Sequence, residues 1–582
     1  MTESLYNLVA SRAFASELLA QMTLAEKAGQ IAQIEKNSIT PEDVTEYSIG
    51  SVLSGGGGNP TPNDAANWTE MVGSYVDASH RSRLGIPLLY GTDAVHGHSN
   101  LFGATIFPHN IGLGAANDPD LVERVYRASA VETTAVGARW MFAPALSVSL
   151  DPRWGRNYES FGDDPQLVSA LGVAAVRGMI GGGPGDPTSA LTSIKHFVGD
   201  GGTTWGSANP VEWLDFWDGW GAGWQLDQGD TEVDEDELRA VHLHPFHASI
   251  AAGALTVMAS YNSWNGDKLH GHRYLLTEVL KQEMAFEGFV VSDWLGQGQL
   301  DPDPARCIAL TLEAGVDMIM VPFDYKNFVS NVESVIESGD LTLDRLDDAV
   351  QRILTVKHAL GLFDGVNDGP SPLDNIGSSE HRKIAREAAA ASAVLLKNDG
   401  DVLPLNSSEV LLAGSGSHNI GNQCGGWTIE WQGASGPITP GTTILDAFDL
   451  QSPRVDVTHS TSGAMPEPMR WPVGVVVVAE PPYAEGNGDS EHCLLPHEDL
   501  QAAHEVRARV EQLVLVVLSG RPVNLDAIAD QCDAIVAAWL PGTEGSGVVD
   551  VLTGAQPFRG QLPRPWFDAW ERGHGLTIGS AQ

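Results

Sequence analysis

The sequence predicts an α/β protein in which an N-terminal (β/α)8 barrel, similar to a TIM barrel, is followed by an α/β sandwich. Short apolar runs alternate with helical segments over the first 365 residues, a stretch rich in Gly, Pro, Asp and Asn follows, and a second α/β pattern begins near residue 379. The chain has 582 residues, and single cores stop growing at about 250–300 residues. We therefore expect domains over residues 1–365 and 379–582, joined by a linker over residues 366–378.

The first part of the chain repeats one unit, a β-branched run followed by a helical segment. This alternation implies parallel strand pairing through βαβ units. Roughly six to eight such units suit a closed barrel, and an open doubly wound sheet is the alternative. The predicted strands are Ile86–Tyr90, Met141–Ser147, Leu191–Phe197, Leu255–Tyr261, Gly288–Ser292 and Met318–Val321. The predicted helices are Pro119–Val136, Pro165–Met179, Glu235–Ala251, Leu275–Glu283 and Pro304–Glu313.

The second domain begins after the sequence FDGVNDGPSPLDN, in which Pro370 and Pro372 disfavour a helix. A helix is predicted over Ser379–Ala393. The apolar runs beyond it are typical of buried strands, so this part of the chain is predicted to be a smaller α/β sandwich. These strands are Val410–Ala413, Val473–Ala479, Leu513–Leu518 and Ile535–Trp539.

Composition excludes several classes of protein. The chain has 33 basic and 75 acidic residues, a net charge of −42, and such a surface repels nucleic-acid phosphates and anionic lipid. We therefore expect no nucleic-acid partner. No apolar run reaches the roughly 18 residues of a transmembrane helix, so we expect no membrane partner either. The four cysteines form no CxxC pair, which predicts buried free thiols. The N-terminus lacks a basic stretch before an apolar one, which predicts a cytoplasmic location, although an exported protein without its signal would have the same sequence.

Polar side chains follow the predicted barrel strands, where the active sites of such barrels lie. Carboxylates, cations and aromatic rings alternate there, and this mixture suits a neutral polyhydroxylated ligand: charged groups bind hydroxyls strongly, and rings cover apolar sugar faces. Taken singly, each has a plain structural reading, such as a helix cap for an aspartate or an ion pair for Lys195 and His196. The residues are Asp93, His96, His98, Asp151, Arg153, Arg156, Glu159, Lys195, His196, Asp200, Tyr261, Asn262, Trp264, Asp293 and Trp294.

Other chemistries lack their motifs. The sequence contains no GxxxxGK[ST] loop, no GxSxG elbow and no HExxH helix, so it does not indicate a P-loop NTPase, an α/β-hydrolase or a zincin. The histidine-containing stretches HGH and HLHPFH lack the spacing of a known zinc site. We therefore predict no metal and no cofactor.

Several motifs, taken together and in order, resemble those of glycoside hydrolase family 3. In the first domain these are GTDAVHGHSN, FAPALSVSLDPRWGRNYESFGDDP, IKHFVGDGGTT, MASYNSWNG and GFVVSDW; in the second they are GGWTIEWQG, EPPYAEGNGD and WLPGTEG. The resemblance extends from MTLAEKAGQ at Met22–Gln30 to GHGL at Gly573–Leu576. It implies a retaining β-glycosidase whose pocket lies between a barrel and an α/β sandwich and takes the non-reducing end of its substrate.

The resemblance also implies roles for individual residues. Asp293, in VVSDW, matches the family nucleophile, and Glu485, in PYAEGNGD, matches the acid/base, with Glu480 as the competing acid in that loop. A retaining mechanism needs one ionised and one protonated carboxyl group about 5–5.5 Å apart. We expect nearby cations to keep Asp293 charged and acidic surroundings to hold the proton of Glu485. The residues matching those that hold the terminal sugar are Asp93, Arg156, Lys195, His196 and Tyr261, and those matching aromatic walls are Trp294, Trp427 and Trp431.

The predicted function is that of an exo-acting β-glucosidase that acts on small oligosaccharides or glycosides. A β-xylosidase of the same family is the nearest alternative. An N-acetylglucosaminidase is disfavoured because the sequence reads KHFVGDG where that branch has KHFPGHG. A sugar-binding protein without catalysis and a phosphorylase are the remaining alternatives, and no oligomeric state is predicted.

One segment departs from the family pattern. Five of the sixteen tryptophans lie between Trp205 and Trp224, where family relatives run more directly from GDGGT to DQGDTE. The segment is either a small satellite core on the barrel or a wall beside the entrance that contacts the leaving-group sugar. Neither interpretation places these tryptophans on the terminal glucose.

Overall fold

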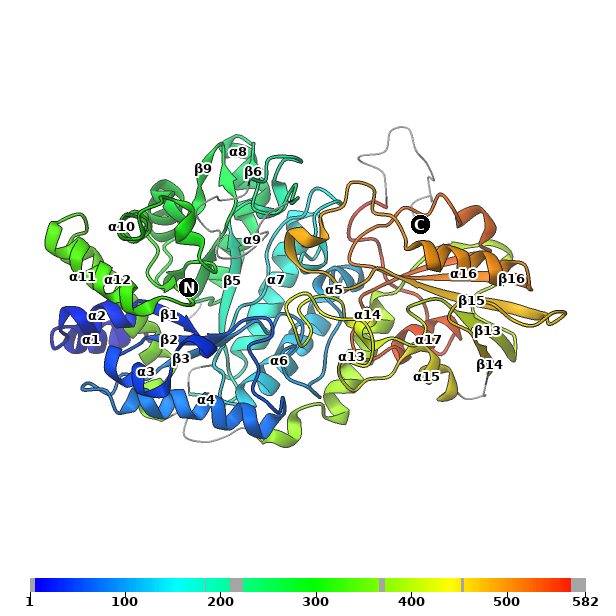
Figure 1. The fold of residues 1–582 in the computed structure, drawn as a ribbon, viewed down its shortest axis with the longest axis horizontal. Helices are drawn as coiled ribbons and strands as arrows, with labels where there is room; N and C mark the ends of the chain where they lie inside the picture. Colours follow the sequence, from blue (N-terminus) through cyan, green and yellow to red (C-terminus); the bar gives the residue numbers. More distant parts are fainter. Residues whose placement is uncertain (1–5, 184, 210–222, 366–371, 452–454, 567–582) are drawn as a thin grey trace.

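The computed structural model describes residues 6–183, 185–209, 223–365, 372–451 and 455–566, and it contains two units side by side (Figure 1). The N-terminal unit, blue to green in Figure 1, is built around a sheet of parallel strands, and the C-terminal unit, yellow to red, around a second sheet. Of the Trp-rich segment, Trp205 and Trp224 are described; Trp213, Trp217 and Trp220 lie outside the described residues.

The N-terminal sheet closes into a barrel. Its eight strands are mutually parallel and follow the order β10-β7-β5-β4-β3-β2-β1-β11. A parallel bridge between Val291 and Met318 joins the two ends of this order, and the Ser292 N–H donates to the Met318 carbonyl over 2.9 Å. The barrel prediction is therefore confirmed, and the open doubly wound alternative is wrong. The strands are β1 (Ala32–Glu35), β2 (Ser51–Ser54), β3 (Leu89–Thr92), β4 (Trp140–Met141), β5 (Leu191–Phe197), β7 (Thr256–Ala259), β10 (Phe289–Val291) and β11 (Ile319–Met320).

Three barrel helices begin at an Asp-Pro pair. Asp118, Asp164 and Asp303 each accept a backbone N–H of the first turn, and the proline that follows occupies the position where no N–H is needed. This local chemistry explains why their predicted starts are confirmed. The helices of the N-terminal unit are α1 (Leu8–Leu19), α2 (Leu24–Gln30), α3 (Pro41–Tyr47), α4 (Ala65–His80), α5 (Asn110–Ala116), α6 (Pro119–Ala135), α7 (Pro165–Ile180), α8 (Glu235–Glu237), α9 (His244–Ala251), α10 (Pro304–Ala314), α11 (Tyr325–Ser338) and α12 (Leu343–Ala359), with π-helical η5 (Leu238–Leu243) and η7 (Tyr274–Glu283).

Strand β4 is much shorter than predicted. The predicted strand Met141–Ser147 shrinks to Trp140–Met141, and beyond it only Ala145 bridges to Lys195 of β5. Pro144 has no N–H to donate to a neighbouring strand, which explains the interruption. The two four-residue strands β1 and β2 were not predicted individually, because runs of that length carry little periodicity.

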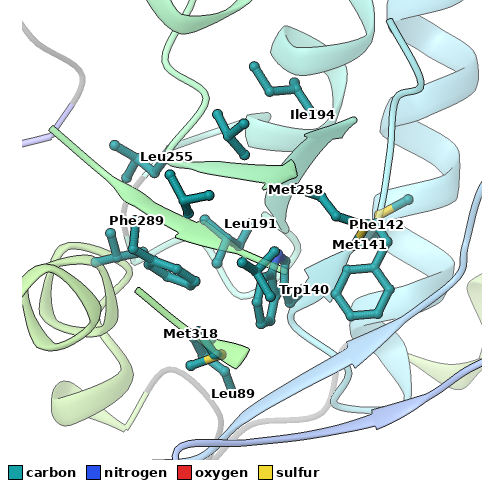
Figure 2. Packing of buried hydrophobic residues seen from close by; sticks show 14 of the residues in the cluster. Leu89, Trp140, Met141, Phe142, Leu191, Ile194, Leu255, Met258, Phe289 and Met318 are labelled. Carbon is teal, nitrogen blue, oxygen red and sulfur yellow. The ribbon is translucent and has the colours of Figure 1, made fainter. Parts of the chain in front are cut away.

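The barrel interior is filled by large apolar side chains. Trp140 lies edge-on to Phe142 and to Phe289, with ring centroids 5.1 and 5.3 Å apart, and its indole N–H donates to Thr256 Oγ1 over 3.0 Å. Figure 2 shows Trp140, Phe289 and Met318 gathered in one cluster between the strands. The barrel is thus a packed core, and any ligand must bind at its rim.

The C-terminal unit is built around a six-stranded sheet, and buried apolar side chains pack on both of its faces. Its order is β12-β17-β16-β15-β13-β14, with only β12 antiparallel to its neighbour. α16 packs against β15 and β16, while α13 packs against α17 and also against α5 and α6 of the barrel. The predicted α/β sandwich is confirmed. The elements are α13 (Ser379–Ser392), β12 (Val394–Asn398), β13 (Glu409–Ala413), α14 (Ile420–Cys424), α15 (Ile444–Asp449), β14 (Asp456–His459), β15 (Trp471–Ala479), α16 (His497–Arg507), β16 (Val510–Leu518), β17 (Ala534–Trp539) and α17 (Ser546–Leu552).

Three short strands form a separate sheet beside the barrel: β6 (Asp230–Thr231), β8 (Ser263–Trp264) and β9 (Asp267–Lys268).

The four cysteines are free and buried, as predicted. Within the described ranges, no helix has the length and apolar character needed to cross a bilayer.

Candidate active site

A cavity of about 310 Å³ lies at the rim of the barrel, and residues of both units line it. All ten residues to which the family resemblance gave a role lie around this one cavity. They are Asp93, Arg156, Lys195, His196, Tyr261, Asp293 and Trp294 from the barrel, and Trp427, Trp431 and Glu485 from the second unit.

Most of the barrel residues stand at the carboxyl ends of parallel strands. Asp93 follows β3, Lys195 and His196 end β5, Tyr261 follows β7, and Asp293 follows β10. In a parallel barrel these ends share one rim. The strands therefore bring side chains that are far apart in the sequence to one place.

Arg156 connects the barrel to the second unit. It precedes the short turn η2 (Asn157–Glu159), and its Nε and Nη2 donate to the two carboxylate oxygens of Glu159, each over 2.8 Å. Its Nη1 lies 3.2 Å from Glu485 Oε1, and its Nη2 lies 3.2 Å from His196 Nε2. Because the guanidinium is almost fully buried and held by Glu159 in a two-point contact, its position is well defined.

Asp293 has one carboxylate oxygen engaged and one left over. Oδ1 accepts the backbone N–H of Trp294 over 2.7 Å. Oδ2 accepts no hydrogen bond from the described part of the chain and lies 3.6 Å from His196 Nε2. Burial raises the pKa of Asp293 to about 6, against the opposing effects of Arg156 and Lys195. The two cations were expected to keep Asp293 charged, but their effect is smaller than that of desolvation. Above pH 6 the carboxylate is nevertheless ionised.

Glu485 comes from the second unit, at the start of the turn η12 (Glu485–Gly488) that follows β15. Burial raises its pKa well above the usual range; Arg156 opposes this, whereas Asp227 and Asp293 add to it. The expectation that this carboxyl group holds its proton agrees with that direction. Its side chain is 14% exposed, so it borders the cavity and can reach a ligand.

Glu480, the competing acid, does not line the cavity. It is buried among donors: Arg521 Nε at 3.1 Å, the Gly520 N–H at 2.9 Å and the Tyr483 hydroxyl at 2.9 Å. A carboxylate held by so many donors has a structural role.

The histidine and lysine of β5 are each held by a carboxylate. His196 Nδ1 lies 2.9 Å from Asp200 Oδ2, and Lys195 Nζ lies 3.4 Å from Asp93 Oδ1. Burial, with Arg156 and Lys195 nearby, keeps the pKa of His196 well below its usual value, so the ring is neutral. Lys195 and Arg156 thus supply the positive charge at this end of the cavity, and His196 supplies a neutral ring nitrogen.

Aromatic side chains line the walls of the cavity. The Trp427 indole N–H donates to Glu159 Oε1 over 3.0 Å, and Lys195 Nζ lies 5.6 Å from the centre of the Trp427 ring. Trp294 lies edge-on to the exposed ring of Phe323 at 5.5 Å. Trp431 closes against the glycine turn after β2, where a Cβ on Gly56 would come within 2.6 Å of the Trp431 backbone. Flat apolar walls beside charged groups suit a sugar ring.

Some lining residues were assigned no role from the sequence, although Phe142, Met258 and Asn487 stand inside motifs quoted for the family. Phe142, Met258 and Met320 look like ordinary core residues, and Asn487 is one polar residue in a loop. Trp224 also lines the cavity, and its indole N–H donates to Asn487 Oδ1 over 3.0 Å. The Trp-rich segment therefore contributes directly to the pocket wall beside Glu485.

Comparison with known proteins places this geometry in a family. Residues 23–356 match the description "Glycosyl hydrolase family 3 N terminal domain", and residues 393–577 match "Glycosyl hydrolase family 3 C-terminal domain". The lysosomal beta glucosidase of Dictyostelium discoideum is 32% identical, over 94% of this chain and 71% of the relative.

Solved structures agree with this assignment. A point mutant of the exo-1,3/1,4-beta-glucanase of a Pseudoalteromonas species is 39% identical, with a TM-score of 0.88 over 96% of this chain and 91% of that one. The beta-glucosidase of Listeria innocua, solved with glucose and, as a mutant, with laminaribiose, is 27–28% identical, with a TM-score of 0.80 over 95% of this chain and 76% of that one. The chain therefore belongs to glycoside hydrolase family 3 and is a two-domain exo-glycosidase of that family.

Proposed function

We propose that this glycoside hydrolase is a retaining β-glucosidase that releases terminal β-D-glucose from the non-reducing ends of oligosaccharides or glycosides. The observation that carries the proposal is the pairing of Asp293 with Glu485 around one cavity, each linked by short contacts to Arg156 or His196. The named activity of the relatives and the glucose and laminaribiose bound by the Listeria enzyme support glucose as the terminal sugar.

The two carboxyl groups divide the reaction between them. Asp293 Oδ2 forms a bond to the anomeric carbon while the bond to the leaving oxygen breaks, and Glu485 transfers its proton to that oxygen. This leaves an α-glucosyl ester on Asp293 and an ionised Glu485. Glu485 then takes a proton from water, the resulting oxygen attacks the anomeric carbon, and Asp293 is released with glucose in the β form. The separation of the two pKa values suits this order of events.

The remaining pocket residues suit a terminal sugar. Asp93, Lys195 and His196 offer charged and neutral hydrogen-bonding groups to ring hydroxyls. A cavity of about 310 Å³, filled on one side by the barrel core, accommodates the end of a glycan and not its middle. This size supports exo-action.

A panel of substrates tests the proposal. We expect the 4-nitrophenyl β-D-glucoside to be cleaved with at least about 10-fold higher kcat/KM than the β-D-xyloside, a difference of about 1.4 kcal/mol, and the N-acetyl-β-D-glucosaminide to be inert. Proton NMR should show β-glucose as the first product. A preference for the xyloside would favour the β-xylosidase alternative, a requirement for phosphate would favour a phosphorylase, and binding of glucose without any turnover would leave a sugar-binding protein.

The pH profile of kcat/KM should be bell-shaped. The acid limb should have its midpoint near pH 6, because burial raises the pKa of Asp293 to about 6 and only its ionised form attacks. The alkaline limb should reflect the loss of the proton of Glu485, whose pKa is raised. Steady-state kinetics with an aryl glucoside measures both limbs. In the Glu485→Ala variant the alkaline limb should disappear, and its persistence would assign that limb to another group.

A further inference from the structure

The loop that carries Glu485 is attached to the barrel by two carboxylates that face in opposite directions. Asp489 of the loop accepts three consecutive barrel N–H groups at Oδ2: Gln225 at 2.9 Å, Leu226 at 2.8 Å and Asp227 at 3.1 Å. Its Oδ1 accepts the Gly155 N–H over 2.9 Å. The barrel segment just after the Trp-rich stretch therefore lies directly against the loop.

Asp227 makes the reverse contact, from the barrel to the loop. Its Oδ2 accepts the Gly486 N–H over 3.1 Å, and its Oδ1 accepts the indole N–H of Trp154 over 3.0 Å. Trp224 covers the same peptide, because a Cβ on Gly486 would come within 2.2 Å of the Trp224 ring. The N–H of the residue directly after Glu485 is thus bound by the barrel, while its carbonyl accepts the Asp489 N–H of its own loop over 3.0 Å.

The backbone of Glu485 needs such support. Its φ is +55°, a left-handed conformation that costs free energy for a residue other than glycine and persists only where the surroundings hold it. On one side, Gln432 binds both the N–H and the carbonyl of Ala484, over 2.9 and 3.3 Å. On the other side, Asp227 binds the Gly486 N–H. Asp227 is therefore one of two anchors that flank the strained residue.

Asp227 is also a charged neighbour of Glu485. The ionisable groups facing Glu485 are Arg156, which favours its ionised form, Asp227, Asp293 and Glu159, which oppose it, and the hydroxyls of Tyr261 and Tyr158. Asp227 itself faces Arg156, Lys268, Asp489 and Glu159, and burial raises its pKa to about 7. Above that pH, the carboxylate of Asp227 opposes a negative charge on Glu485.

We propose that Asp227 is a positioning residue for the proposed reaction: it holds the Gly486 amide so that Glu485 faces the leaving oxygen, and it presents a carboxyl group to that same acid. The inference rests on the proposed function, in which Glu485 is the acid. Asp227 opens the stretch DQGDTE that family relatives share, but no role was assigned to it from the sequence, because its partner Gly486 lies 259 residues further along the chain.

The test is Asp227→Asn, which preserves the size of the side chain and removes its charge. We expect the alkaline limb of kcat/KM to move to lower pH, because Glu485 loses a negative neighbour. We also expect kcat/KM for phenyl β-D-glucoside, a poor leaving group, to fall by about 10-fold or more, part of the 10²–10⁴-fold that general acid catalysis contributes. The 2,4-dinitrophenyl glucoside should be nearly unaffected. The control is Glu232→Gln, an exposed charge removal five residues away, which should leave both readouts unchanged.

Asp227→Glu retains the charge and displaces the anchor. Its alkaline limb should stay at the wild-type pH while turnover of the phenyl glucoside falls. Equal losses for both leaving groups, or an alkaline limb that does not move in Asp227→Asn, would overturn the inference. If Asp227→Asn does not fold, Asp227→Glu decides: a loss confined to poor leaving groups supports the role, and a uniform loss overturns it. If Glu485→Ala itself shows no dependence on the leaving group, the proposed function fails instead.

Discussion

Replacing Asp293 with alanine should lower kcat for aryl β-glucosides by about 10⁴-fold or more, the scale of loss expected when a catalytic nucleophile is removed. The reason is geometric. Oδ1 of Asp293 accepts the Trp294 N–H, whereas Oδ2 accepts no hydrogen bond from the described part of the chain. The fold should persist, because the side chain supports no strand pairing. Steady-state kinetics together with a melting curve measures both expectations.

Added azide should restore part of the activity of this variant. The small anion enters the space left by the carboxylate and attacks the anomeric carbon from the face that Asp293 occupies. The product should therefore be the α-glucosyl azide, which NMR distinguishes from the β anomer. The matched control is Asp301→Ala, eight residues after Asp293. It removes a carboxylate that pairs with the exposed Arg306, and it should retain full activity. Near-normal turnover of Asp293→Ala without azide would remove Asp293 from the role.

Much of the fold could be predicted from the sequence because its signals are local. An Asp-Pro pair starts three of the barrel helices, and the predicted strand Leu191–Phe197 matches β5 along its whole length. Where a signal was interrupted, the predicted bounds were wrong: Pro144 interrupts the pairing that would have extended β4, and only Ala145 beyond it bridges to β5. The four-residue strands β1 and β2 were not predicted, because runs of that length carry little periodicity of their own and depend on pairing with their neighbours.

The site could be predicted in part for the same reason. Residues that end strands share a rim whatever their distance in sequence, so Asp93, Lys195 and Asp293 meet as expected. The contacts of Asp227 with the Glu485 loop could not be predicted, because they depend on how two domains dock. The balance of charge and burial at Asp293 could not be predicted either: desolvation, which depends on the complete surroundings, outweighs the two nearby cations.

Replacing Glu485 with alanine should have an effect that depends on the leaving group. For phenyl glucoside or a glucose disaccharide, kcat/KM should fall by about 10²–10⁴-fold, the contribution of general acid catalysis. For 2,4-dinitrophenyl glucoside, formation of the glucosyl ester should be nearly unchanged, since that leaving group departs without a proton. A plot of log kcat/KM against leaving-group pKa should therefore be steep for the variant and shallow for the wild type.

Glu480→Gln provides the control that separates the two acids of this loop. Glu480 is held by Arg521 Nε and the Gly520 N–H, so its amide variant should lower the melting temperature and leave the dependence on the leaving group as in the wild type. Azide should act on Glu485→Ala after the glucosyl ester has formed, from the face where water normally enters, and yield the β-glucosyl azide. Because Asp293→Ala is expected to give the α-azide, the two anomers report which carboxyl group is missing. A β-azide from Glu480→Gln, or a steep leaving-group plot for it, would exchange the roles of Glu480 and Glu485.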